Sequence, residues 1–229
     1  MNIQFYQKLT LLDYPSKTAA TVFTYGCNLR CPFCHNAALV VRPADAQIIE
    51  GEFFAFLEKR KGLLDGVCIT GGEPLLQPDI TDFIRKIKDK GFLVKLDTNG
   101  FFPEKLELLL KDGLIDYVAM DIKNSPEKYS VTCGIETADI EKVKKSVDLL
   151  KNSGIEFEFR TTTVKEYHSV EDFISIGKWL CGNYKYYIQC FNDSGDTIKK
   201  DLTSPTENDL NAYKSAVLPY LPLAEIRGV

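Results

Sequence analysis

Three cysteines stand close together in the sequence, at a spacing that could bind a metal cluster. Cys27, Cys31 and Cys34 follow the apolar run Ala20–Tyr25 and form a C-x3-C-x2-C pattern. Three thiolates at this spacing can bind three irons of a cubane iron–sulfur cluster and leave the fourth iron without a protein ligand. Because an exogenous molecule can coordinate that open iron, the spacing indicates an enzyme.

The same residues leave other kinds of site open. Ferredoxin-type carriers usually supply four cysteines per cluster, and no fourth cysteine lies near these three in the sequence. A zinc site could use His35, but His35 directly follows Cys34, and adjacent residues rarely bind one tetrahedral ion together. An odd total of seven cysteines does not fit a disulfide framework. The open cluster is the favoured interpretation, with zinc as the alternative.

The composition is that of a cytoplasmic enzyme. With 229 residues, 45% hydrophobic and 26% charged, the chain can bury a full core. We expect no signal peptide and no membrane span, because no run of about eighteen apolar residues is present. Seven cysteines without a signal suggest a reducing compartment. A net charge of −4 argues against a nucleic-acid partner, whose binding surface would be basic.

The elements that must position the cysteines follow from alternating apolar and amphipathic segments. Strands are predicted over Ala19–Tyr25, Val67–Thr70, Phe92–Asp97, Tyr117–Ile122, Ile155–Val164 and Tyr186–Phe191. Helices are predicted over Asp79–Lys90, Pro103–Asp112 and Ala138–Ser153. Two more helices should begin at Ser169 and Ser204, because an acidic residue stands three positions after each serine, as in a capping box.

Repeated strand–helix units predict an α/β fold with a parallel sheet and right-handed crossovers. Six units are fewer than the eight of a closed barrel, so we predict an open partial (β/α)6 barrel, with a doubly wound sheet as the alternative. We expect one domain over residues 1–229. Residues 1–18 would form one or two capping strands, residues 19–191 the barrel, and residues 192–229 an extension with a helix.

Polar and glycine-rich segments follow the predicted strands. Besides the cysteine loop they are Gly71–Pro74, Asp97–Gly100, Asp121–Lys123 and, within the fifth strand, Arg160. The carboxyl ends of parallel strands form the face where ligands bind, so these groups should meet at one mouth. Two glycines let a ligand approach the backbone, and Glu73 could accept a hydrogen bond from an ammonium group. Each segment could instead be only a turn or a surface salt bridge.

These motifs resemble the radical S-adenosylmethionine (SAM) superfamily. The C-x3-C-x2-C loop with Phe33 before its last cysteine, and Gly71-Gly72-Glu73-Pro74, carry that resemblance. The segments Cys34-His35-Asn36, Leu96–Gly100 and Asp121-Ile122-Lys123 are similar to the activating enzymes of glycyl radical proteins. With Leu12–Pro15 they resemble most the activating proteins of anaerobic ribonucleoside-triphosphate reductases. The resemblance covers nearly all the chain and is weakest after about Tyr167.

The resemblance implies one 4Fe–4S cluster bound by Cys27, Cys31 and Cys34, with SAM on the open iron. Reductive cleavage of SAM would yield a 5′-deoxyadenosyl radical that takes a hydrogen atom from a glycine Cα of the reductase. A flavodoxin- or ferredoxin-type protein would donate the electron. The positions that would contact SAM, or a monovalent cation beside it, are Phe33, Asn36, Gly71, Gly72, Glu73, Pro74, Asp97, Thr98, Asn99, Asp121, Lys123 and Arg160.

The resemblance also assigns parts within this set. Gly71–Pro74 would meet the methionine ammonium, and Phe33 would border the adenine. Asp97, Thr98 and Asp121 match cation-binding positions. The basic side chains near the SAM carboxylate and ribose would be Lys123 and Arg160. The resemblance gives no role to the remaining cysteines, which we expect to be packing or incidental thiols: Cys68, Cys133, Cys181 and Cys190.

Two other functions stay open. One is a radical SAM enzyme that activates another glycyl radical protein or modifies a small molecule or peptide, such as the ring-contraction enzyme that forms deazaguanine. The other is a non-catalytic iron–sulfur or zinc module. For a protein partner, we expect recognition by the polar segment Asn124–Thr137, with Glu127, Lys128 and Tyr129 taking part.

Replacing Cys27, Cys31 or Cys34 with Ala should abolish the cluster and SAM cleavage, because each thiolate would bind its own iron. Wild-type protein reconstituted without oxygen should hold about four iron and four sulfide per chain, as measured by iron and sulfide analysis. A triple variant that still cleaves SAM reductively would refute the site. Ala variants of cysteines outside the motif should keep most of their iron; these controls are Cys68, Cys133 and Cys181.

Overall fold

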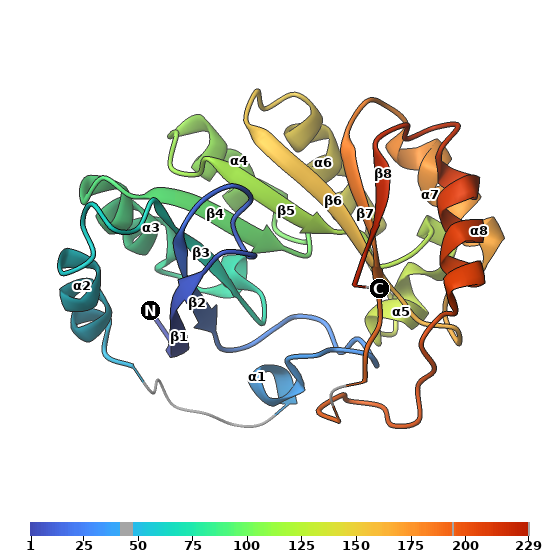
Figure 1. Ribbon diagram of the computed structural model, residues 1–229, viewed down its shortest axis with the longest axis horizontal. Helices are drawn as coiled ribbons and strands as arrows, with labels where there is room; N and C mark the ends of the chain where they lie inside the picture. The colour runs from blue at the N-terminus through green and yellow to red at the C-terminus, as the bar shows by residue number, and fades with distance from the viewer. Residues whose placement is uncertain (42–47, 194, 229) are drawn as a thin grey trace.

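A computed structural model describes residues 1–41, 48–193 and 195–228. Its strands form one open sheet in chain order, and neighbours are parallel except for the first pair. Figure 1 shows this sheet as a curved wall with β1 and β8 at its two ends. The strands are β1 (Ile3–Thr10), β2 (Ala19–Thr24), β3 (Gly66–Gly71), β4 (Leu93–Thr98), β5 (Tyr117–Asp121), β6 (Glu156–Thr163), β7 (Lys185–Cys190) and β8 (Ala224–Arg227).

Helices lie along the outer side of the curved sheet, and shorter ones lie near the carboxyl ends of the strands (Figure 1). The outer helices are α2 (Glu50–Glu58), α3 (Ile80–Asp89), α4 (Pro103–Lys111), α6 (Ile140–Lys151), α7 (Val170–Leu180) and α8 (Glu207–Val217). The short ones are α1 (Ala37–Val41), η1 (Pro74–Leu76), η2 (Pro126–Lys128) and α5 (Tyr129–Cys133). None of the helices within these described ranges is long and apolar enough to cross a membrane.

The predicted open α/β barrel is confirmed, with differences at its ends. All six predicted strands are present as β2 to β7, within one or two residues of their expected bounds. Residues 1–18 contribute one strand, β1, which pairs with β2 inside the same sheet. The extension adds β8, which the sequence did not predict. With only four residues, alternating Ala and Ile with Glu and Arg, β8 has too little apolar pattern to be recognised.

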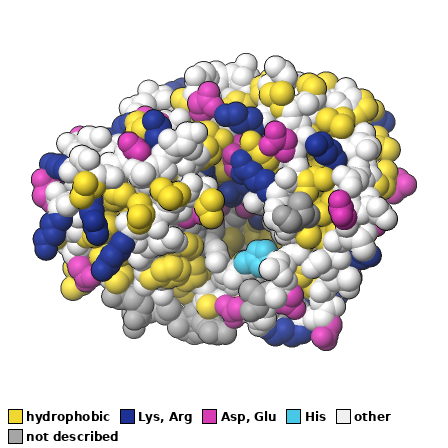
Figure 2. Space-filling model, viewed as in Figure 1, with side chains coloured by type: hydrophobic (Ala, Val, Ile, Leu, Met, Phe, Trp, Pro, Cys, Tyr) yellow, Lys and Arg dark blue, Asp and Glu magenta, His cyan; other side chains and the backbone are white. Residues whose placement is uncertain are grey.

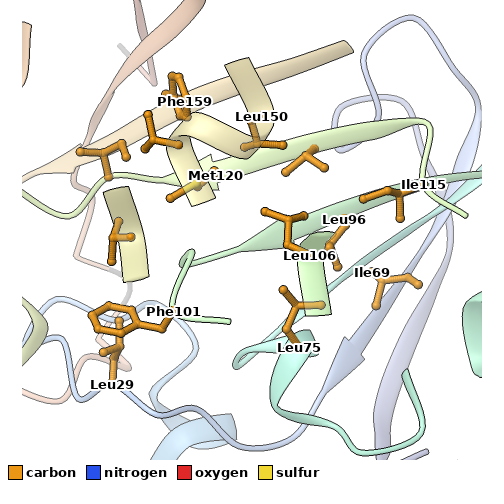
Figure 3. Close-up of a cluster of buried hydrophobic side chains, with 14 of the residues drawn as sticks. Leu29, Ile69, Leu75, Leu96, Phe101, Leu106, Ile115, Met120, Leu150 and Phe159 are labelled. Carbon is orange, nitrogen blue, oxygen red and sulfur yellow. The ribbon is translucent and has the colours of Figure 1, made fainter. Parts of the chain in front are cut away.

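The core lies between the sheet and the outer helices because successive strand residues point to opposite faces. On β5, Val118 and Met120 are fully buried on the helix side, whereas Asp121 ends the strand half-buried at the pocket. Figure 3 shows Met120 in one apolar cluster with side chains of neighbouring strands and helices. Leu29 of the cysteine loop and Phe101 of the loop after β4 belong to this cluster, so the core also fixes the loops that carry polar groups.

Of the two predicted capping boxes, the one at α7 is confirmed and the one at α8 begins at a different residue. Ser169 and Asp172 form the expected box at the start of α7. At α8 the N-cap is Thr206, whose hydroxyl accepts a hydrogen bond from the backbone N–H of Asp209 at 3.2 Å. The prediction of Ser204 as the cap was therefore wrong by two residues. Thr206 also has an acidic residue three positions later, Asp209, and these two residues form the capping box.

Thr206→Ala should lower the free energy of unfolding by about 1 kcal/mol, because the N-terminal N–H groups of α8 lose their acceptor. Ser204→Ala is the matched control and should change it by less than about 0.5 kcal/mol, since Ser204 is exposed and caps nothing. Urea denaturation of the metal-free protein under reducing conditions measures both. Equal losses in the two variants would contradict the position of the cap.

Candidate active site

One pocket opens at the carboxyl ends of the parallel strands, and nearly all the predicted site residues line it. The only exception is Pro74. In Figure 2 this face is hollowed at its centre, with Lys and Arg side chains on the wall and a histidine at the edge. The pocket is lined by Cys27, Leu29, Cys31, Phe33, Cys34, His35, Asn36, Val40, Thr70, Gly71, Gly72, Glu73, Asp97, Thr98, Asn99, Asp121, Lys123, Arg160 and Thr162.

The cysteine loop leaves β2 and is held in place by backbone hydrogen bonds. Gly26 N–H donates to the Leu39 carbonyl at 2.9 Å, and Cys34 N–H donates to the Cys31 carbonyl at 3.0 Å. The Cys27 sulfur accepts a hydrogen bond from the Leu29 N–H at 3.4 Å. Hydrogen bonds to sulfur favour the thiolate form, which is the form that binds metals.

The three thiols of the motif open onto one pocket. All three line the pocket, but within the described ranges no three Cys, His, Asp or Glu side chains converge closely enough to hold one metal ion. Thiolates of a cubane cluster bind different irons and therefore stand further apart. The His35 ring, which a zinc site would need, stacks on Phe191 at 5.3 Å, and its Nε2 lies 3.0 Å from the Asn192 carbonyl oxygen.

The ordinary pKa values of the thiols are shifted by their surroundings. Burial, together with the charge of Glu73, raises the pKa of Cys27 to about 12, and burial also raises the pKa of Cys34. The neighbouring Cys133 thiol instead lowers the pKa of Cys31 to about 7. Metal binding releases the protons of such thiols, so neutral cysteines before binding are compatible with a cluster.

Backbone contact joins the Gly71-Gly72 turn to the start of the cysteine loop. Glu73 N–H donates to the Gly26 carbonyl oxygen at 2.8 Å. A Cβ on Gly72 would lie 1.9 Å from that same oxygen, so no other residue fits without moving the backbone. Gly71 has φ +125°, a conformation that side chains rarely adopt. The two glycines are therefore required by the fold, whatever ligand the turn contacts.

The Glu73 carboxylate is buried and accepts three hydrogen bonds from its own chain. The donors are Leu75 N–H at 3.0 Å, Thr98 Oγ1 at 2.9 Å and Asn99 N–H at 2.7 Å. Burial outweighs these donors and raises the pKa of Glu73 to about 7. Its predicted contact with the SAM ammonium stays a prediction, but the structure gives Glu73 a second task, which is to connect the loops after β3 and β4.

Paired charges form one side of the pocket. Arg160 on β6 contacts Asp121 at 2.9 Å and Asp97 at 3.4 Å, and Lys123 contacts Asp121 at 3.0 Å. Burial alone would raise the pKa of Asp121, but Arg160 and Lys123 lower it to about 2. The buried ammonium of Lys95 also pairs with Asp97. Both carboxylates are therefore ionised, and the pocket offers positive and negative groups side by side.

The sequence of this chain matches the Radical SAM superfamily over residues 21–180. The chain belongs to this superfamily. It is 38% identical over 227 residues to a protein of Methanocaldococcus jannaschii named "Putative glycyl-radical enzyme activating enzyme", covering 96% of this chain and 93% of that protein. It is 29% identical over 220 residues to the pyruvate formate-lyase-activating enzyme of Clostridium pasteurianum, covering 93% of this chain and 79% of that enzyme. Within the superfamily, the chain belongs to the family of glycyl-radical enzyme activating enzymes.

A similar fold is found in solved structures of other proteins. Streptococcus suis SuiB bound to the precursor peptide SuiA superposes with a TM-score of 0.68 at 17% identity. The alignment covers 90% of this chain but 47% of SuiB, which is much longer. At this identity the likeness establishes the radical SAM fold alone.

Several residues in or next to the pocket of this radical SAM enzyme were not predicted from the sequence as site residues. Thr162, which stands two positions after Arg160, lines the pocket. Lys95, which stands two positions before Asp97, pairs with the Asp97 carboxylate. Strand alternation could have found both, because residues two apart share a face. His35 and Cys133 could not have been placed in this way, since their contacts come from distant segments: Phe191 for His35, and Cys31 for Cys133.

The segment expected to recognise the partner is more ordered than the sequence suggested. Residues Asn124–Thr137 are not an extended polar loop, because they contain η2 and α5. Tyr129 is 1% exposed, and its hydroxyl accepts a hydrogen bond from the Lys123 N–H at 3.2 Å. It is therefore a core residue, and its proposed part in recognition was wrong. Glu127 and Lys128 are exposed as expected, and Val131, 57% exposed, lies on the same surface segment.

Glu73→Ala should lower the free energy of unfolding of the metal-free protein by about 2–5 kcal/mol, because three buried donors lose their acceptor. Glu73→Gln keeps one acceptor oxygen and should lose less. Glu104→Ala is the control on an exposed glutamate at the start of α4 and should have little effect. Thermal and urea denaturation measure the series. A Glu73→Ala protein as stable as wild type would refute the structural role.

Proposed function

We propose that this radical SAM enzyme installs a glycyl radical on an anaerobic ribonucleoside-triphosphate reductase. Cys27, Cys31 and Cys34 would bind one 4Fe–4S cluster, and SAM would occupy the pocket beside them. The observation that carries the proposal is the pocket itself, which brings the three thiols and the paired charges of β4, β5 and β6 to one mouth.

The chemistry of the pocket suits the amino-acid end of SAM, which carries an ammonium and a carboxylate. Lys123 and Arg160 can interact with a carboxylate, while Asp97 and Asp121 can interact with positive charge. Because these four side chains already pair with one another, they are fixed in place before a ligand binds. Arg160 also supplies positive charge between the two carboxylates, so the monovalent cation expected there stays a prediction.

The chain's own residues would orient the ligand and limit its contact with water. When bound and reduced, the cluster and SAM supply a 5′-deoxyadenosyl radical able to abstract a hydrogen atom from a glycine Cα. Phe33, 3% exposed, presents a buried aromatic wall for the adenine. Asn36 is fixed by donation from its Nδ2 to the Gly71 carbonyl at 3.0 Å. Shielding of this kind protects a reactive intermediate from side reactions.

Recognition of the reductase would use the rim of the pocket. The open sheet leaves β1 and β8 unpaired with each other, so access to the pocket is not closed by a continuous barrel wall. The exposed surface of η2 and α5, with Glu127, Lys128 and Val131, lies directly after the strand that carries Asp121. A flavodoxin- or ferredoxin-type donor and a cytoplasmic location complete the proposal.

Protein, SAM and a one-electron reductant should generate a glycine-centred radical on the cognate anaerobic reductase, visible by electron paramagnetic resonance. Val131→Glu should reduce this radical at least several-fold without slowing SAM cleavage, because it adds charge to the rim. Leu63→Glu is the matched control, since Leu63 is an exposed leucine before the other end of β3. Brisk SAM cleavage with no radical on the reductase would overturn this substrate and favour another glycyl radical protein, a peptide or a small molecule.

A further inference from the structure

Lys95 carries a positive charge inside the barrel, next to the paired charges of the pocket but outside its lining. It is 2% exposed and does not line the pocket, whereas Asp97, two positions later on β4, does. Figure 3 shows Leu96 in the apolar cluster on the helix side of the sheet. Because neighbouring strand residues point to opposite faces, Lys95 and Asp97 both point into the barrel. A buried cation therefore lies behind Asp97.

The ammonium of Lys95 has one charged partner. Its Nζ donates a hydrogen bond to Asp97 Oδ1. It also lies 3.8 Å from the Cys68 sulfur and 6.0 Å from the centre of the Tyr117 ring. Among the described residues, Asp97 provides the only carboxylate that forms a salt bridge with Lys95. Since a buried charge is costly without a partner, Lys95 and Asp97 hold each other in place.

Arg160, by contrast, is shared unequally between two carboxylates. Its Nε and Nη2 each lie 2.9 Å from Asp121 Oδ1, whereas its Nη1 lies 3.4 Å from Asp97 Oδ2. The other oxygen of Asp97 accepts the hydrogen bond from Lys95. Asp97 is thus neutralised mainly from inside the barrel, and Nη1 of Arg160 is held only by a long contact. Because Arg160 lines the pocket, this nitrogen is available to a ligand.

The paired charges that line the pocket are balanced before a ligand binds. Two are acidic and two are basic: Asp97, Asp121, Lys123 and Arg160. A ligand carboxylate that contacts Arg160 competes with Asp97 for the same guanidinium. Without Lys95, Asp97 would then be a buried carboxylate with no other salt-bridge partner among the described residues. Lys95 supplies the additional positive charge that compensates both carboxylates.

We propose that Lys95 is a positioning residue that neutralises Asp97 from inside the barrel and so leaves Arg160 free to bind the carboxylate of the ligand. The inference rests on the proposed function, in which that ligand is SAM. It also predicts selectivity, because only a ligand with a carboxylate at its amino-acid end gains from a free Arg160. In the absence of Lys95, Asp97 would draw on Arg160 for its charge, and this gain would be lost.

The test compares the binding of two adenosine ligands to the reconstituted protein, measured by equilibrium dialysis without oxygen or reductant. S-adenosylhomocysteine keeps the amino-acid end of SAM, whereas 5′-methylthioadenosine lacks it. Lys95→Met should raise the Kd of S-adenosylhomocysteine at least about tenfold and leave that of 5′-methylthioadenosine within about twofold. A tenfold change in Kd corresponds to about 1.4 kcal/mol, close to the lower limit for a hydrogen bond to a charged group.

Controls separate a positioning role from damage to the barrel. Arg227→Met also removes a cation from a buried carboxylate, Glu158 at 3.0 Å, but neither residue lines the pocket, so both affinities should stay unchanged. In an Asp97→Asn background, Lys95→Met should change the affinity for S-adenosylhomocysteine about twofold or less, because no carboxylate is left to hold Arg160. Lys95→Gln keeps a neutral donor to Asp97 and should still weaken S-adenosylhomocysteine several-fold.

The outcomes separate this inference from the proposed function. Lys95 variants with wild-type iron content and wild-type affinity for S-adenosylhomocysteine overturn the inference alone. Equal weakening of both ligands, or loss of folded protein in both the Met and the Gln variant, overturns it too, because Lys95 would then only support the fold. A wild-type protein that assembles no cluster or does not bind SAM overturns the proposed function and, with it, this inference.

Discussion

The buried carboxylate of Glu73 joins the loops on which the site depends. It receives hydrogen bonds from Thr98 and Asn99, and the Asn99 side chain in turn donates to Asn28 at 2.9 Å and contacts the Cys27 sulfur at 3.8 Å. One acidic group thus connects the loops after β2, β3 and β4. Since buried donors are costly to leave unpaired, any movement of one loop disturbs the other two. Glu73, which lies outside the cysteine motif, therefore helps to fix the position of the cysteines.

The paired charges on one side of the pocket also depend on one another, and burying them costs more free energy than burying neutral groups. Removing an ion from water is unfavourable, and a buried pair is stable only when each charge has its partner. Asp121 has two cationic partners, Arg160 and Lys123, while Asp97 has Arg160 and Lys95. A zwitterionic ligand can interact with this network without leaving a charge uncompensated, because it brings one group of each sign. A ligand of a single charge would have to disrupt it.

Strands β2 to β7 and most outer helices could be predicted because each has a local pattern, as the buried positions of α3 show: Ile80, Phe83, Ile84 and Ile87. The outer helix α2 and strand β8 were not predicted. The mouth of the barrel could also be predicted, since parallel strands end on one side. Contacts between distant segments could not. Two of the three donors to Glu73, Thr98 and Asn99, lie 25 and 26 residues later in the chain, and no spacing rule joins Cys133 to the loop that carries Cys31. Tyr129 looked exposed because its neighbours are polar, yet it fills the core.

The short helix α5 contributes both to the protein surface and to the packing around the cysteine loop. Its outer side carries the exposed Val131, while its inner side carries the buried Tyr129, Thr132 and Cys133. The same five residues therefore separate the protein surface from the cysteine loop. A helix this short has little stability of its own, so its place depends on packing and on the hydrogen bonds of Asn124. Rim and cysteine loop are consequently parts of one packed unit, and the geometry of one constrains the other.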